Sequence, residues 1–296
     1  MAYSSLYLPH GCNLNFRLLC RKIVTESSTF IDAVPASAVD VADRGLAYGH
    51  GLFETMRMAA GRIPLWSYHR ERLLRGLPLL GIELAESRLE AEFAGVLKQL
   101  PADGVVKLMV TAGSGGRGYR APATIVPRIL WQRSSAPPSR DRARLQVCRH
   151  RLPIHGALAG LKHLNRLDQV IAAGELVGDN LGLMLDADGN LVEGVSHNLF
   201  MYIDGSWLTP PLDRCGVAGV MRAVLMREIF PQAQERVRES RCVLEDLHRC
   251  EALFLCNAVT GITQGSAVEG GPEWNFSDKT RRIRAVLEEK YPCFTA

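Results

Sequence analysis

The stretch GLKHLNRLDQVIAAGE, from Gly160 to Glu175, decides how the rest of the chain is interpreted. Its centre predicts an amphipathic helix with Leu164, Leu167 and Ile171 on one face. Just before that helix stands Lys162, one of six lysines in a chain that also has 29 arginines. A lysine in this position is normally exposed to solvent, so its position alone assigns it no function.

The composition is that of a globular protein, with 296 residues, 47% of them hydrophobic, and a net charge of +4. The chain has no run of basic residues and no apolar stretch long enough to cross a bilayer, so we expect neither nucleic acid nor a membrane as a partner. The eight cysteines form no C-x-x-C pair and no zinc spacing. We therefore expect no metal site, and free thiols in a reducing compartment, the cytoplasm.

The order of predicted elements divides the chain into four segments. Residues 1–26, almost free of acidic side chains, form an N-terminal extension. Residues 27–133 alternate strands and helices and predict a small α+β domain. Residues 134–144 are rich in proline, serine and charge and predict a linker, and residues 145–296 again mix strands and helices. The expected fold class is therefore α/β in two domains.

Three further motifs can contribute to a binding site. Glu193, in LVEGVSHNLFMY, falls between two apolar strands, where a surface acid is the ordinary interpretation. Gly216 and Gly219, in RCGVAGVMRAV, precede a helix, so unpaired backbone N–H groups can face an anion there. The stretch FLCNAVTGIT offers a second turn of this kind. A lysine amine, an acid for a ring nitrogen and a phosphate-binding turn are the three requirements of pyridoxal 5′-phosphate (PLP).

Six motifs in this order resemble those of the fold-type IV PLP enzymes. That family includes branched-chain and D-amino-acid aminotransferases and the 4-amino-4-deoxychorismate lyases. The resemblance covers roughly residue 30 to the C-terminus and implies a small N-terminal α/β domain and a larger C-terminal pseudo-barrel domain. The motifs are DRGLAYGHGLFETMR (Asp43–Arg57), HRERL (His69–Leu73), GLKHLNRL (Gly160–Leu167), EGVSHNLF (Glu193–Phe200), GVMR (Gly219–Arg222) and LCNAVTGI (Leu255–Ile262).

The resemblance implies a role for individual residues. Lys162 would be the Schiff-base lysine and the general base and acid, and Glu193 would pair with the pyridine nitrogen. Arg72 would bind the phosphate. Backbone amides would complete the phosphate site, those of Val220 and Met221 on one side and those of Ala258 and Val259 on the other.

Candidates for the substrate carboxylates are Lys107, Arg117 and Tyr119, acting in part across a dimer interface. Two positions depart from the family pattern: His50 replaces an acid common in the family, and Met221 replaces a threonine.

GLKHLNRL and GSGGRGY look most like the lyases of the family. The implied activity is the release of pyruvate from 4-amino-4-deoxychorismate to give 4-aminobenzoate, a folate precursor, in a homodimer that binds a small substrate with carboxylates. A D-amino-acid or branched-chain aminotransferase on the same scaffold is the alternative. A non-catalytic protein of this fold is disfavoured by the presence of both Lys162 and Glu193.

Overall fold

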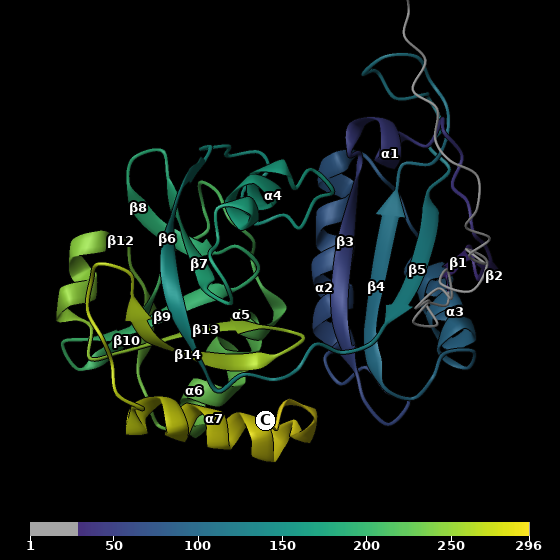
Figure 1. Cartoon of the computed structure of the whole chain (residues 1–296). Coiled ribbons are helices and arrows are strands. Elements are labelled where there is room, and N and C mark those ends of the chain that lie inside the picture. Colours follow the sequence, from purple (N-terminus) through teal and green to yellow (C-terminus); the bar gives the residue numbers. More distant parts are fainter. Residues whose placement is uncertain (1–28, 296) are drawn as a thin grey trace, which may run out of the picture.

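The computed structural model describes residues 29–295. They form two β-sheets of different size that lie side by side, each with helices packed against it (Figure 1). The predicted α/β fold, with a smaller sheet first in the chain and a larger curled sheet after it, is confirmed. The predicted N-terminal extension, residues 1–26, lies outside the described residues.

The smaller sheet has five antiparallel strands in the order β2-β1-β5-β4-β3. Alternate residues of β3 are buried, including Met56 and Met58, because successive side chains of a strand point to opposite faces. Two helices cover this face and contribute Leu73 and Leu89 to its core. The strands are β1 (Thr29–Ile31), β2 (Val34–Pro35), β3 (Gly51–Met58), β4 (Gly104–Thr111) and β5 (Arg128–Ser134).

The larger sheet has nine strands in the order β11-β10-β9-β13-β14-β6-β7-β8-β12 and mixes parallel with antiparallel pairs. Its central strands are buried on both faces, so they appear in the sequence as unbroken apolar runs. They are β6 (Arg142–Leu152), β7 (Leu181–Asp186), β8 (Asn190–Gly194), β9 (Asn198–Ile203), β10 (Ser206–Thr209), β11 (Val237–Glu239), β12 (Cys242–Val243), β13 (Ala252–Asn257) and β14 (Gly261–Val268).

The helices cover the faces of both sheets and leave a seam between them. In Figure 1, α2 lies along β3, whereas α7 runs along the lower side of the larger sheet. The aromatic rings of Phe200, Trp207 and Phe254 pack together in the core beneath α5 and α7. The helices are α1 (Arg44–Tyr48), α2 (Trp66–Gly76), α3 (Glu86–Leu97), α4 (Leu167–Gly174), α5 (Val220–Val224), α6 (Phe230–Gln232) and α7 (Asp278–Lys290).

A short segment joins the two sheets. Because β5 ends at Ser134 and β6 begins at Arg142, residues 135–141 form the connection. The division of the chain at residues 133 and 145 stays a prediction. Within residues 29–295, no helix has the length and apolar character that crossing a membrane requires.

The predicted helix after Lys162 begins later than expected. Leu164 precedes α4, and Leu167 and Ile171 are 75% and 51% exposed, so the prediction that these three side chains share a helical face was wrong. The reason is a long-range pairing: Leu164 donates its N–H to the carbonyl of Gly51, at the start of β3. This pairing therefore keeps the segment before α4 out of the helix that local periodicity favoured.

Candidate active site

A cavity of about 760 Å³ lies in the seam between the two sheets. Phe53 and Thr55 of β3 and Arg72 of α2 reach it from the smaller sheet, and Glu193 of β8 and Asn257 of β13 reach it from the larger one. Its volume falls within the range of pockets that bind small molecules and cofactors. All seven predicted cofactor-binding residues line it: Lys162, Arg72, Glu193, Val220, Met221, Ala258 and Val259.

The backbone on either side of Lys162 fixes its position in the seam. The carbonyl of Lys162 accepts the N–H of Phe53 at 2.9 Å, and Gly160 exchanges hydrogen bonds with the segment 216–218. Gly160 has a φ of +76°, a conformation that glycine adopts without strain. The Nζ atom of Lys162 lies 4.3 Å from the centre of the Phe53 ring, so the side chain is held at the cavity wall.

The environment of Lys162 favours a neutral amine. Burial, with Arg72 and Arg166 adding to it, lowers the pKa of Lys162 to about 8, whereas Glu54 and Glu193 oppose the shift. An ammonium group loses hydration on burial, and neighbouring cations penalise it further. About a tenth of the amine is therefore unprotonated at pH 7, far more than for an exposed lysine, and this neutral form can act as a nucleophile or base.

In the cofactor-free protein, we expect Lys162 to lose its proton near pH 8, whereas exposed lysines lose theirs at about pH 10.4. Because the shift is downward, the neutral form prevails above pH 8. NMR of protein carrying ¹³C-methyl groups on its lysines measures this titration, and Lys162→Ala identifies the signal by its loss. A Lys162 signal that titrates together with the exposed lysines would contradict the assignment.

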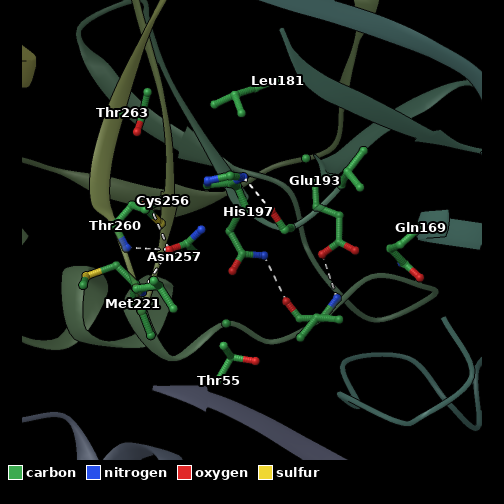
Figure 2. A pocket seen from close by; sticks show the side chains of 18 of the residues that line it. Thr55, Gln169, Leu181, Glu193, His197, Met221, Cys256, Asn257, Thr260 and Thr263 are labelled. Carbon is green, nitrogen blue, oxygen red and sulfur yellow. Dashed lines mark hydrogen bonds between the residues drawn. The ribbon is translucent and has the colours of Figure 1, made fainter. Parts of the chain in front are cut away.

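Glu193 points into the cavity from the end of β8, as Figure 2 shows. It is buried, and its Oε2 accepts the N–H of Val217 at 2.9 Å. Burial raises the pKa of Glu193 to about 7, although Val217, Arg166 and Lys162 each lower it. A buried carboxylate with so few partners is stabilised by a cation, and a protonated ring nitrogen would supply one.

Arg72 is fixed by a buried acid on β3. Its Nε donates to Oε1 of Glu54 at 2.8 Å, Nη2 donates to the other carboxylate oxygen, and Nη1 donates to the carbonyl of Ala218 at 2.9 Å. Burial favours a raised pKa for Glu54, but Arg72 and His69 hold it at about 2. The Nδ1 of His69 lies 2.5 Å from Glu54, so the acid is held from both sides.

Two turns of the larger sheet also line the cavity, and the first of them contacts Arg72 through the carbonyl of Ala218. Val220 and Met221 begin α5, where the first N–H groups of a helix have no intrahelical acceptor. A Cβ added at Gly219 would lie 1.8 Å from Oδ1 of Asn198, so the turn requires glycine. Asn198 in turn donates to the carbonyl of Val217 at 2.9 Å and holds this turn in place.

The second turn, after β13, is closed by its own side chain. Oδ1 of Asn257 accepts the N–H groups of Val259 and Thr260, at 2.9 and 2.8 Å, and also the Thr260 hydroxyl (Figure 2). Ala258 and Val259 both line the cavity, but the N–H of Val259 is engaged within the turn.

The three predicted substrate residues do not line this cavity. Lys107, on β4, has its Nζ 5.2 Å from the centre of the Phe53 ring, the same ring that Lys162 approaches. Arg117 and Tyr119 are exposed on the loop between β4 and β5. Tyr119 borders a second cavity of about 700 Å³, which shares Arg166 with the first.

His50 has a role in holding that loop. Nδ1 of His50 accepts from Nε of Arg44 at 3.2 Å, and its Nε2 lies 2.8 Å from the carbonyl of Leu80. Arg44, which is buried, donates to the carbonyls of Gly118 and Tyr119 at 3.2 and 2.8 Å. The histidine found here in place of an acid therefore fixes an arginine that shapes the glycine-rich loop.

Sequence reasoning gave no role to three further residues that line the cavity, Thr55, Arg166 and His197, and included Asn257 only as part of a candidate anion-binding turn. Thr55, His197 and Asn257 are labelled in Figure 2, and Arg166 follows Lys162 in the same motif. Burial, with Lys162 adding to it, lowers the pKa of His197 to about 4, so its ring is neutral at pH 7. Each of these residues lies inside a motif quoted above, but only the fold shows that it faces the cavity.

Comparisons with known proteins agree with this arrangement. The model of the family described as amino-transferase class IV matches residues 51–268. The structure of 4-amino-4-deoxychorismate lyase from Pseudomonas aeruginosa is 40% identical, with a TM-score of 0.85 over 89% of this chain and 99% of that one. An aminodeoxychorismate lyase from Vibrio harveyi is 29% identical, over 87% of this chain and 98% of the relative.

Branched-chain amino acid aminotransferase from Escherichia coli shares the fold, with a TM-score of 0.79 at 20% identity over 90% of this chain and 94% of that one. The seam cavity is lined by a lysine with a lowered pKa and by a buried acid, two of the groups that a PLP site requires. The chain belongs to the class IV aminotransferase family.

Proposed function

We propose that this protein is a PLP-dependent lyase that converts 4-amino-4-deoxychorismate to 4-aminobenzoate and pyruvate. One observation carries the cofactor assignment: a lysine with a lowered pKa and a buried acid line a single cavity. The choice of lyase over aminotransferase rests on the likeness to the Pseudomonas aeruginosa and Vibrio harveyi lyases.

The residues that line the cavity fit PLP. Glu193 is a buried acid that a pyridinium nitrogen would neutralise. Arg72 and the amides of Val220, Met221 and Ala258 would hold the phosphate, because guanidinium groups and helix N-termini both favour this anion. Val259 would have to release Asn257 to join them. When bound, PLP supplies an electron sink next to the reacting carbon.

The reaction requires two proton transfers. A proton leaves the ring carbon that bears the amine, the bond from the ring to the enolpyruvyl oxygen breaks, and a proton is added to the leaving group, which becomes pyruvate. Lys162 suits both transfers, since its pKa of about 8 lies near the operating pH of a general base and acid. Glu193 would place a negative charge near the pyridine nitrogen of bound PLP and would favour its protonated form.

We also propose that the protein is a cytoplasmic homodimer. Apolar side chains around the second cavity are exposed, including Leu46 at 65%, Leu167 at 75% and Val170 at 62%. A contiguous apolar surface of this kind is typical of an interface between subunits. The loop with Arg117 and Tyr119 borders the same surface, so we propose that these residues, with Lys107, act on substrate in the assembled dimer. Free cysteines such as Cys256 fit a reducing compartment.

A substrate comparison tests the proposed function. We expect the holoenzyme to form 4-aminobenzoate and pyruvate from aminodeoxychorismate faster than it transaminates D-alanine or leucine with 2-oxoglutarate. Absorbance of 4-aminobenzoate and a coupled pyruvate assay measure the first reaction, and chromatography of the amino acids measures the second. Transamination that exceeds pyruvate release would identify an aminotransferase.

A further inference from the structure

Three arginines line the seam cavity, and they differ in their partners. Arg72 is paired with Glu54, and Arg140, in the segment that connects the sheets, lies 3.3 Å from Oδ1 of Asp179. Arg166 has no carboxylate within salt-bridge distance anywhere in residues 29–295. It is therefore the cavity arginine whose charge the described chain leaves without an acidic partner.

The guanidinium of Arg166 is held by the backbone around Lys162. Its Nε donates to the carbonyl of His163 at 2.8 Å, and its Nη2 donates to the carbonyl of Leu161 at 3.3 Å. These carbonyls belong to the two neighbours of Lys162, so the lysine and the guanidinium are positioned by the same backbone. Nη1 makes no hydrogen bond to any residue between 29 and 295 and stays available to a ligand.

Partial burial of the Arg166 guanidinium removes a positive charge from water, which costs free energy unless an anion binds it. The side chain is partly buried and borders both the seam cavity and the second cavity. Burial lowers the pKa of Arg166, and Glu193 and Asp168 only partly oppose this shift. A cation removed from water is stabilised when an anion reaches it, and a guanidinium matches a carboxylate with two parallel hydrogen bonds.

We propose that Arg166 binds a carboxylate of the substrate beside Lys162. The inference rests on the proposed function and deepens it, because it assigns a carboxylate subsite to a residue of the same chain that holds the lysine. The substrate class is an amine that carries two carboxylates. The amine reaches Lys162 while one carboxylate is held by the neighbouring guanidinium, which sets the orientation of the carbon that loses its proton.

Chorismate is a suitable probe because it has both carboxylates of the substrate and a hydroxyl in place of the amine. We expect Arg166→Gln holoenzyme to bind chorismate about 10- to 100-fold more weakly than wild type, the range for loss of a hydrogen-bonded charge. KM for aminodeoxychorismate should rise by a similar factor, with a smaller change in kcat. Arg166→Lys keeps the positive charge but cannot donate two parallel hydrogen bonds to a carboxylate, so it should recover part of the affinity. Titration calorimetry gives the first result and pyruvate release the second.

Two controls separate binding from structure. PLP content, measured by absorbance, should be the same in Arg166→Gln as in wild type. Arg140→Gln is the matched variant, because Arg140 lines the same cavity but is paired with Asp179, and its chorismate affinity should stay within about twofold of wild type.

Each other outcome overturns a stated claim. Unchanged chorismate binding and KM in Arg166→Gln, in a wild type that releases pyruvate, would overturn this inference alone. An equal loss in Arg140→Gln would assign the effect to the general charge of the cavity. Dissociation of Arg166→Gln into monomers on gel filtration would assign the residue to a contact between copies. A wild type that releases no pyruvate would overturn the proposed function and, with it, the substrate assigned to Arg166.

Discussion

Lys162→Ala is expected to lower kcat for 4-aminobenzoate formation by about 10⁴-fold or more, the upper range for loss of a general acid–base group. The reason is that Lys162 lines the cavity and has a lowered pKa, so it can supply a neutral primary amine. Its neighbours His163 and Arg166 carry an imidazole and a guanidinium, and neither group can replace that amine. Steady-state pyruvate release measures the effect, and circular dichroism shows whether the fold is intact.

Borohydride labelling identifies the reacting amine independently of rate. Both Lys162 and Lys107 approach the ring of Phe53, at 4.3 and 5.2 Å, but only Lys162 lines the cavity. We expect the label from PLP on the peptide that contains Lys162 and none on the peptide that contains Lys107. Label on Lys107, or full activity of Lys162→Ala, would refute the assignment.

Glu193→Gln is expected to retain PLP but lower kcat by about 100-fold or more, as for the loss of an electrostatic stabiliser in an active site. Glutamine keeps the shape of the side chain and can still accept the N–H of Val217, but it carries no charge to hold the pyridine nitrogen protonated. Absorbance gives the PLP content, and pyruvate release gives the rate.

The exposed acid Glu251 supplies a matched control, since Glu251→Gln removes the same charge away from the cavity. Its rate should be that of wild type. If Glu193→Gln is as active as Glu251→Gln, then Glu193 is not the partner of the ring nitrogen.

The sequence predicted the type of fold and the residues of the cofactor cavity through ordered motifs. Glycine-bearing turns, an acid after a strand and a lysine before a helix are local features, and the resemblance placed them in one site. The structure brings all of them to one cavity because β8, β13 and the turn before α5 end at the same seam.

Other features could not be predicted, because they depend on contacts between distant residues. Leu164 has helical spacing with Leu167 and Ile171 but lies outside α4, since its backbone pairs with β3 more than 100 residues earlier, and the other two side chains are exposed. Arg166 belongs to the motif GLKHLNRL, but the sequence alone assigned it no role. Neither its partial burial nor its lack of an acidic partner can be inferred from residue types. The ordering of the glycine-rich loop by Arg44 and His50 is likewise a product of the fold.

The backbone pairing of Lys162 has a consequence for how the protein folds. The lysine comes from the part of the chain that forms the larger sheet, but its carbonyl is bound by Phe53 of the smaller one. A complete catalytic pocket therefore exists only after the two halves have docked, and neither half alone can present it. A cofactor that binds only this docked state stabilises the association by mass action, so its occupancy would link the unfolding of the two halves into one cooperative event.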